Sequence, residues 1–205
     1  MKKILLIVIL IILSNQFSKS ISHDSINYKL SVNYCLDLSD SYGKGDLLNS
    51  EFFVTKSWYG VSIGYGHFNG HSTIYYSVFV EDLNKTIEIQ LDEVSFVKSG
   101  SLSFLFIPIK SSFFETEIIF GLAYSKATIS QFKNVDYNYD LINDRFKYLY
   151  KNYILVKKDH FGYQAGFNIS FFPVKNAGIQ LNSRIQHLNN GGSFFFVGGG
   201  VCFRF

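Results

Sequence analysis

Hydrophobic and polar residues alternate with a period of two along several stretches of this chain, most clearly in residues 177–188. The apolar positions there begin with Ile179 and Leu181, and polar side chains occupy the positions between them. The stretches 27–37 and 161–171 follow the same rule. Such alternation is typical of β-strands whose two faces lie in different environments, so these three stretches are predicted to be strands.

Weaker forms of the pattern extend the prediction to eight strands. The Asn69-Gly70 pair predicts a tight hairpin turn, and residues 38–56, which are rich in Ser, Asp and Gly, are predicted to form a loop. Longer connections are expected at 83–100 and 129–159, with short turns near Phe113–Glu115 and Pro173–Asn176 at the other end of the strands. The additional strands are expected near 57–68, 72–82, 101–112, 116–128 and 194–205.

Long and short connections in alternation favour an all-β fold, an eight-stranded antiparallel up-and-down transmembrane β-barrel with short turns in the periplasm. An even number of strands places both chain ends on the periplasmic side. Residues 85–97 also alternate, and they would either extend a hairpin above the membrane or raise the count to ten strands. We adopt eight strands as the prediction.

The two faces of the strands distinguish a membrane barrel from a soluble one. A soluble barrel hides its apolar face inside, whereas a small membrane barrel turns that face toward lipid and closes its sheet. The opposite face here is small and polar, as at Gly60, Ser62 and Gly64, which suits the narrow lumen of eight strands. A secreted, soluble, lipocalin-like lipid-binding barrel is the alternative fold.

The predicted lumenal face also carries charged residues within strands. A charge in a soluble core is costly unless it is paired, whereas charges in a narrow lumen can pair across it. We therefore expect an ionic network that plugs the lumen, so that the barrel is not an open pore. Its predicted members are Lys29, Glu81, Lys110, Glu117, Arg184 and Arg204.

The N-terminus has the layout of a cleaved secretory signal peptide. Met1-Lys2-Lys3 is basic, residues 4–13 are an unbroken aliphatic run, and Ser18-Lys19-Ser20 resembles a cleavage site. The aliphatic run is about half of the ~20 residues that a spanning helix needs, which makes an uncleaved anchor the weaker alternative. We predict a signal peptide at 1–20 and one barrel domain at 21–205, located in the outer membrane.

The amino-acid composition limits the classes of partner that the protein is expected to bind. Without Lys2, Lys3 and Lys19, the 19 basic residues fall to the number of acidic residues, 16, so no basic patch for nucleic acid is expected. Aromatic residues make up 18% of the chain, which suits strands. The expected partners are outer-membrane lipid including lipopolysaccharide, the barrel-insertion machinery, and an extracellular or envelope protein; no cofactor is expected.

Several motifs in the C-terminal half carry a family resemblance. They are Ile107–Lys110, Glu117–Leu122, Gly162–Gly166, Gly178–Arg184 and the terminal Gly198–Phe205. They resemble the outer-membrane β-barrel domain family of the Bacteroidota, the PorT-like and OmpA-like small barrels, over 101–205 and more loosely over 27–82. Ending on Phe205 resembles the signal that barrel-insertion machinery recognises. The resemblance implies fold and location, and it implies no particular activity.

No residue pattern predicts catalysis or a metal site. His187 lies near Ser193 across the last loop, and a His can activate a Ser when a third group orients the ring. An outer-rim lipid-modifying enzyme is therefore the alternative function. His67 and His71 flank the predicted turn, but two His without a third ligand are usually surface residues. We expect a structural, adhesive or accessory role, with no catalytic, metal-binding or cofactor-binding residues.

The segment 129–159 is a candidate binding surface outside the membrane. Tyrosine offers rigid contact area with a polar tip, which is common at binding surfaces. The alternatives are that the basic residues meet lipid phosphates and that the tyrosines belong to an aromatic girdle at the membrane interface. The candidate residues are Tyr137, Tyr139, Arg145, Lys147, Tyr148, Tyr150, Lys151 and Tyr153.

The two cysteines fall on the first and last predicted strands, which are neighbours in a closed barrel. Cys202 lies close to the end of its strand, and Cys35 lies well along its own. A disulfide needs Cα atoms within about 7 Å, which this placement does not favour. We predict two free thiols buried in the lumen.

Overall fold

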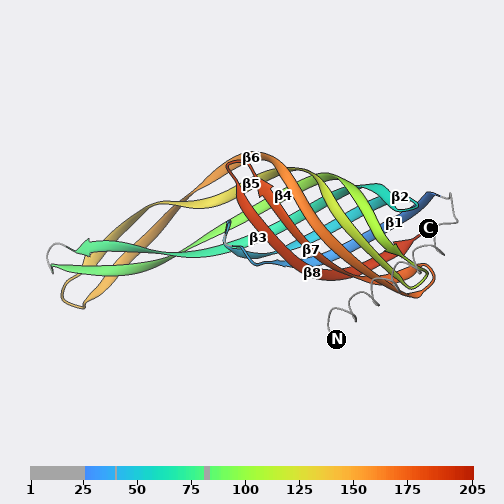
Figure 1. Cartoon of the computed structure of the whole chain (residues 1–205). Coiled ribbons are helices and arrows are strands. Elements are labelled where there is room, and N and C mark those ends of the chain that lie inside the picture. The colour runs from blue at the N-terminus through green and yellow to red at the C-terminus, as the bar shows by residue number, and fades with distance from the viewer. Residues whose placement is uncertain (1–25, 40, 81–83) are drawn as a thin grey trace, which may run out of the picture.

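The computed structural model describes residues 26–39, 41–80 and 84–205, which form one closed antiparallel β-barrel (Figure 1). The predicted signal peptide at 1–20 and Glu81 lie outside the described residues. Each strand pairs with its neighbours along the chain, and β1 pairs with β8 to close the barrel. The strands are β1 (Ile26–Asp37), β2 (Lys44–Lys56), β3 (Tyr59–Val80), β4 (Lys85–Lys110), β5 (Phe114–Asp140), β6 (Arg145–Val174), β7 (Ala177–Leu188) and β8 (Gly192–Arg204). The predicted fold class is confirmed.

Two of the predicted elements are nevertheless wrong. Residues 44–56, predicted to be a loop, form β2, and the Asn69-Gly70 pair lies inside β3 instead of in a turn. Asn69 pairs with strands on both sides, so ladder hydrogen bonding overrides the turn preference of the dipeptide. Gly70 is required for space, because a Cβ there would lie 2.3 Å from the carbonyl oxygen of Tyr42. The prediction missed β2 and divided β3 into two strands. These two errors cancel, so the predicted count of eight strands is still correct.

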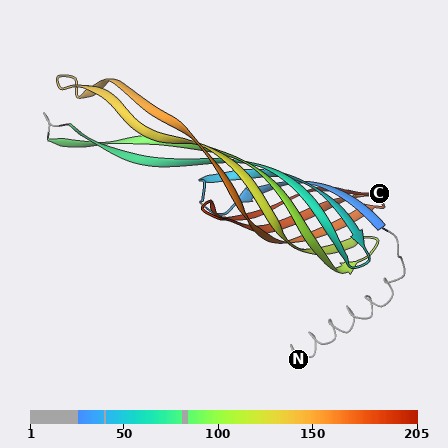
Figure 2. The same ribbon diagram turned by 90° about the horizontal axis from the view of Figure 1, so that it is seen from above.

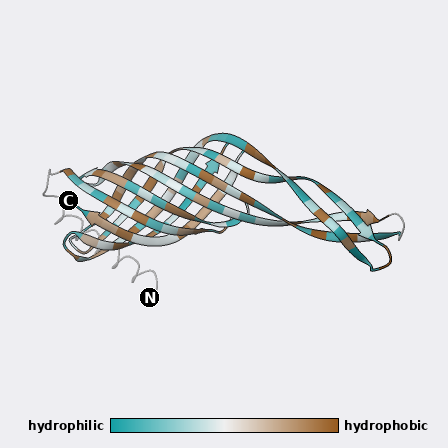
Figure 3. Cartoon of the chain, turned by 180° about the vertical axis from the view of Figure 1, so that it is seen from behind, coloured by the Kyte–Doolittle hydropathy of each residue, from teal (hydrophilic) through white to brown (hydrophobic). Residues whose placement is uncertain are grey.

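The alternation of the sequence sorts the side chains between the two sides of the wall. Along β3, Gly60, Ser62 and Gly64 are inward and buried, as predicted, while the intervening Val61 and Ile63 are 49% and 65% exposed. Figure 3 shows hydrophobic and hydrophilic residues alternating along the barrel strands. Large apolar side chains are exposed around the barrel on all eight strands. The apolar face therefore points outward and the polar face lines the lumen.

Strand ends carry the residues that tolerate irregular backbone. Both prolines of the chain, Pro108 and Pro173, lie at breaks in strand register near one end of the barrel, where the ladder does not need the missing N–H. The β2–β3 turn has Ser57 at a φ of 55°, and the last turn has Asn190 at 57°. Asn tolerates this left-handed region better than most residues.

Two long hairpins extend beyond the barrel at the end away from the C-terminus (Figures 1 and 2). Pairing between β4 and β5 stops at Val94 and Ser130, while the β3–β4 and β5–β6 ladders continue outward. We call this projection the hairpin arm: residues 72–80 and 84–93 of one hairpin and 131–154 of the other. Residues 85–97 thus extend a hairpin, which was one of the two expected outcomes. The expected connections at 83–100 and 129–159 are largely strand.

No helix among the described residues is long and apolar enough to cross a membrane.

Candidate functional site

One ionic cluster occupies the lumen near the chain termini. The ammonium of Lys29 on β1 pairs with Glu117 on β5, and its Nζ lies 3.1 Å from Oε1 of Glu115. Nη2 of Arg204 on β8 lies 2.8 Å from Oε2 of Glu115, and the guanidinium carbon lies 3.4 Å from the ring centroid of Phe172. Two bases and two acids from three strands neutralise one another, which is the condition for burying charge at tolerable cost.

A second ion pair crosses the middle of the lumen. Nη2 of Arg184 on β7 donates to Oε2 of Glu51 on β2 at 2.7 Å, and both side chains are almost fully buried. The hydroxyl of Ser62 donates to the other Glu51 oxygen at 2.8 Å. The carboxylate therefore has a partner for each oxygen.

Neutral polar residues extend the first cluster from Glu117 into the lumen. The amide of Asn168 donates to Oε2 of Glu117 at 2.8 Å, and Asn182 donates to Oδ1 of Asn168 at 2.6 Å. On the β1 side, Asn33 donates to Oε1 of Gln180 at 3.0 Å. These amides are buried, and the bond between Asn33 and Gln180 links β1 with β7, two strands that do not pair with one another.

The structure groups the predicted network residues differently from the prediction. It brings Lys29, Glu117 and Arg204 together and places Arg184 in a separate pair. Nζ of Lys110 lies 3.5 Å from the hydroxyl of Thr55. Sequence reasoning missed two acids, Glu51 and Glu115, because the first lies in the segment taken for a loop and the second in a predicted turn. Strand bounds that included both residues would have placed them in the lumen by parity.

An apolar cluster closes the lumen at the arm end. Its largest members are Phe68, Phe194 and Phe196, whose rings contact one another with centroids 5.4 to 6.0 Å apart. Phe53, Leu105 and Ile119 form a smaller cluster elsewhere in the lumen. Side chains of both polar and apolar kinds thus fill the interior.

Both cysteines are free and buried, as predicted. Cys35 is the Cα partner of Gly198, and Cys202 is the Cα partner of Ser31. The two thiols are therefore separated by four residues along β1, or ~13 Å at about 3.3 Å per residue.

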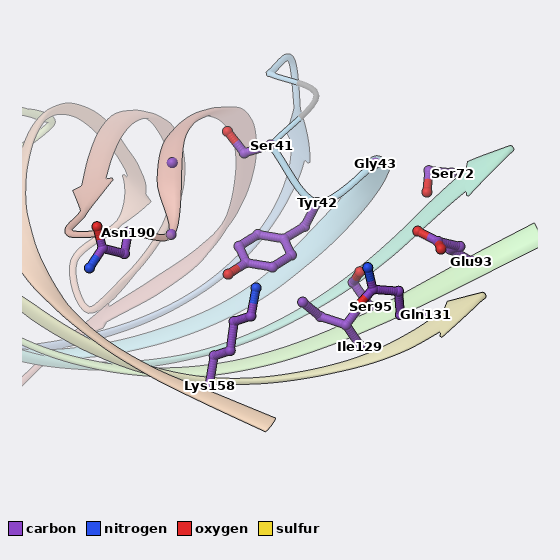
Figure 4. A pocket seen from close by; sticks show the side chains of 12 residues that line it. Ser41, Tyr42, Gly43, Ser72, Glu93, Ser95, Ile129, Gln131, Lys158 and Asn190 are labelled. Atoms are coloured by element: carbon purple, nitrogen blue, oxygen red, sulfur yellow. The ribbon is translucent and has the colours of Figure 1, made fainter. Parts of the chain in front are cut away.

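A polar recess of about 440 Å³ opens between the barrel mouth and the base of the arm (Figure 4). The hydroxyl of Tyr42 lies 2.7 Å from Nε2 of His160, and the His160 Nδ1 lies 3.1 Å from the carbonyl oxygen of Asn189. A carbonyl only accepts, so Nδ1 carries the proton and Nε2 accepts from Tyr42. Burial raises the pKa of the Tyr42 phenol. Besides Tyr42, the residues that line the recess include Ser41, Ser72, Glu93, Ser95, Gln131 and Lys158.

The two hairpins of the arm pack against each other. Val78, Ile89 and Leu91 of the first hairpin are buried, and they contact apolar residues of the second, including Phe132 and Phe146. Tyr137 donates to the carbonyl oxygen of Phe79 at 3.3 Å, and Lys151 donates to that of Gln90 at 2.7 Å. The arm has an apolar interior of its own.

The predicted binding residues all lie on the arm, in two roles. Tyr137 and Lys151 join the hairpins, and Tyr139 packs edge-on to Phe146 with centroids 5.0 Å apart. Tyr148 and Tyr150 form an exposed pair with centroids 5.4 Å apart. The remaining candidates are Arg145, Lys147 and Tyr153, of which Tyr153 contacts Phe132 edge-on.

The histidine candidates lie on the outward face. Nδ1 of His187 is 2.8 Å from the Ser193 hydroxyl, and its ring lies 5.1 Å from that of Tyr163. No carboxylate of the described residues forms an ion pair with His187. His67 and His71 lie four residues apart on β3 instead of flanking a turn, and no cluster of metal ligands occurs among the described residues.

No protein-family model matches the sequence, and neither does the sequence of any curated protein. Solved structures do resemble the fold. The outer membrane protein OprG of Pseudomonas aeruginosa has a TM-score of 0.56 at 11% identity, covering 89% of this chain and 97% of that one. A major outer membrane protein of Thermus thermophilus has a TM-score of 0.54 at 13% identity, covering 87% of this chain and 99% of that one.

The attachment invasion locus protein Ail of Yersinia pestis, solved in complex with the heparin analogue sucrose octasulfate, has a TM-score of 0.52 at 13% identity. That match covers 88% of this chain and 99% of Ail. At such identities the likeness shows the fold alone. The chain has the fold of small outer-membrane β-barrels.

Proposed function

We propose that this chain is an integral outer-membrane protein without catalytic activity, whose barrel anchors the hairpin arm as a structural, adhesive or accessory element of the cell surface. The observation that carries the proposal is the inversion of the barrel: large apolar side chains point outward, and the charged residues of the lumen are buried and paired. Only lipid satisfies such an outer surface around the whole barrel. A soluble lipid-binding barrel would need an apolar interior with room for its ligand.

The barrel sets the direction in which the arm points. Both β1 and β8 have their chain ends away from the arm, and the turns at that end are short, as at Ser57-Trp58 and Lys175-Asn176. Outer-membrane barrels have short periplasmic turns and longer extracellular segments. This polarity supports an arm that lies outside the cell.

The composition of the arm suits contact with another macromolecule. Tyr148 and Tyr150 are 45% and 64% exposed on one hairpin, and Tyr75 and Phe79 are 70% and 50% exposed on the other. Aromatic side chains on a rigid support lose little conformational freedom on binding. An extracellular or envelope protein is the partner that such a surface favours.

The finer family assignment rests on motifs alone. The glycine-rich β8 and the terminal Phe205 support membership of the PorT-like barrels of the Bacteroidota and recognition by barrel-insertion machinery. Binding of a heparin-like polyanion is not proposed for this chain, because the arm carries acidic residues such as Asp136, Asp140 and Asp144 among its bases.

Surface labelling tests the orientation. Ile142 at the tip of the arm is 94% exposed, Lys175 lies in a turn at the opposite end, and both native thiols are buried. A membrane-impermeant maleimide should label Ile142→Cys on intact cells and Lys175→Cys only after permeabilisation. Labelling of Lys175→Cys on intact cells, with Ile142→Cys protected, would overturn the proposal.

Attachment assays test the role of the aromatic pair. Cells carrying Tyr148→Ser/Tyr150→Ser are compared with wild type for attachment to plastic coated with serum proteins, with Lys157→Ser, an exposed position outside the candidate surface, as the matched control on the same strand. An adhesive arm predicts a loss confined to the tyrosine variant. Equal attachment of all three strains would leave a structural or accessory role in place of adhesion.

The contact between His187 and Ser193 favours one alternative, a lipid-modifying enzyme at the outer rim. A serine nucleophile needs a base that is itself oriented by a third group, and the described residues supply no carboxylate to this ring. The alternative predicts that His187→Ala changes the mass profile of cellular lipid A while the barrel still folds. The non-catalytic proposal predicts an unchanged profile.

A further inference from the structure

Two lysines face each other on the outer surface of the barrel. Lys98 on β4 and Lys126 on β5 are exposed and are direct Cα partners. Their sequence neighbours Val97 and Ala127 are buried in the lumen, so both lysines point outward. Like charges directly opposite each other in an antiparallel pair destabilise a sheet. An anion between the two ammonium groups would remove this cost.

The neighbouring residues offset the charge of the pair only in part, because Asp159 is the Cα partner of Lys126 and Nζ of Lys126 lies 6.0 Å from the centroid of the Tyr124 ring. The row of Cα partners continues to His67 on β3 and to Asp159 on β6. The Oδ1 of Asp159 accepts a hydrogen bond from the Tyr124 hydroxyl at 3.0 Å. Among the described residues, no carboxylate forms an ion pair with Lys98 or Lys126.

A notch adjoins the lysines on the side toward the chain termini. Gly100 lies on the same face as Lys98, and its two Cα partners are Tyr65 and Tyr124. A Cβ added at Gly100 would meet no atom within 4 Å, and the flanking tyrosines are 55% and 43% exposed. The outward apolar face of β4 resumes at Leu102, which is 57% exposed. The notch is therefore open space at Gly100, flanked by two exposed tyrosines and adjoining the lipid-facing surface at Leu102.

We propose that this site binds a phosphate-bearing lipid of the outer leaflet. Lys98 and Lys126 hold the phosphate group, and the notch at Gly100 takes the adjoining hydrocarbon. This assignment rests on the proposed outer-membrane location, because tyrosines that border an apolar surface mark the membrane interface. A free phosphate ion would contact only the two lysines. A lipid is favoured because its hydrocarbon can also occupy the notch at Gly100.

Native mass spectrometry of the barrel tests the site. Full-length processed protein is reconstituted in phosphatidylcholine nanodiscs containing a minority of phosphatidic acid, and the lipids retained after release are counted. Wild type should retain phosphatidic acid, and Lys98→Gln/Lys126→Gln should bind it about 30-fold more weakly. Gly100→Leu keeps both charges but fills the notch, and it should also lose the lipid. Lys175→Gln, at the opposite end, should bind as wild type does.

A second measurement separates binding from structure. Removing the repulsion in Lys98→Gln/Lys126→Gln should raise the unfolding temperature of the barrel in a nonionic detergent, while lipid retention falls. Inorganic phosphate should fail to displace the lipid from wild type. Equal retention by wild type and both site variants, or displacement by inorganic phosphate, would overturn the inference. Failure of the protein to enter the nanodisc as a barrel would instead overturn the proposed function.

Discussion

Arg184 on β7 and Glu51 on β2 meet across the lumen, with Nη2 and Oε2 at 2.7 Å. The two strands are far apart around the barrel wall and do not pair. The contact therefore fixes the interior across its width, and it belongs to the residues that exclude an open channel.

Removing one partner of this pair should destabilise the barrel strongly. Glu51→Gln leaves the Arg184 guanidinium buried without its counter-charge, so we expect a loss of about 3–5 kcal/mol in the free energy of unfolding. Urea titration of folding into lipid vesicles measures it. The double variant Glu51→Leu/Arg184→Met should recover most of the loss. A single variant within ~0.5 kcal/mol of wild type, the range of ordinary surface changes, would contradict the assignment.

The filled lumen should not conduct ions. Phe68, Phe194 and Phe196 close the arm end, and the cluster around Lys29 and Glu115 occupies the terminal end. Planar bilayers containing the folded protein should show conductance no greater than bilayers with protein-free detergent. Stepwise channel openings that scale with the amount of folded barrel would show that the side-chain packing described here is wrong.

The interior of the arm should hold its two hairpins together independently of the barrel. Leu91 is fully buried between them, so Leu91→Asp places an unpaired carboxylate in an apolar site and should separate the hairpins. Limited proteolysis should then cut the arm faster, while the membrane-embedded barrel stays intact. Phe79→Asp, at a half-exposed position on the outer face, is the control. Equal protease resistance of wild type and Leu91→Asp would refute the packing.

A pH-dependent contact stabilises the tip of the arm. The Tyr139 hydroxyl donates to Oδ1 of Asp144 at 2.5 Å, which lowers the pKa of the Asp144 carboxyl and raises the pKa of the Tyr139 phenol. The Asp144 carboxylate contributes to the stability of the arm through this contact. Its contribution is complete above the pKa of about 3.9 that the carboxyl has in the unfolded chain, and it is lost as the pH falls through the lower pKa of the folded state. The contribution of the Tyr139 phenol to stability is complete below about pH 10, and it is lost as the pH rises through the higher pKa of the folded state.

NMR titration of a ¹³C-labelled Tyr139 ring measures this coupling. Asp144→Asn should shift the Tyr139 pKa down toward about 10, because the amide carries no charge to hold the phenolic proton. Asp136→Asn, on the same hairpin and bonded to Asn152 instead, is the control. An unchanged Tyr139 titration in Asp144→Asn would show that the contact does not form in solution.

The sequence was most informative where one face of a strand is uniformly apolar. The strands at 27–37 and 177–188 match β1 and β7 closely, because lipid on one side and a polar lumen on the other impose a strict period of two. In β2 the outward face includes Lys44, Asp46 and Ser50, so the apolar signal weakens and the strand was missed. The Asn69-Gly70 pair carries a local turn preference that cross-strand pairing overrides.

The contacts inside the lumen and the arm were harder to predict from the sequence than the fold. Parity placed Lys29, Glu117 and Arg204 in the lumen, but which charges meet depends on strand register, and the alternating pattern does not determine register. The packing of the two hairpins likewise depends on contacts between segments that share no ladder. The site at Lys98 and Lys126 emerges only when β4 and β5 are aligned residue by residue.

Mobility on a gel tests the central claim of a closed membrane barrel most directly. Outer-membrane fractions of cells that express the protein are run with and without boiling. A closed barrel in the outer membrane predicts that the protein is found in that fraction and that its mobility shifts on boiling. Recovery in the aqueous fraction, with identical mobility before and after boiling, would contradict the account.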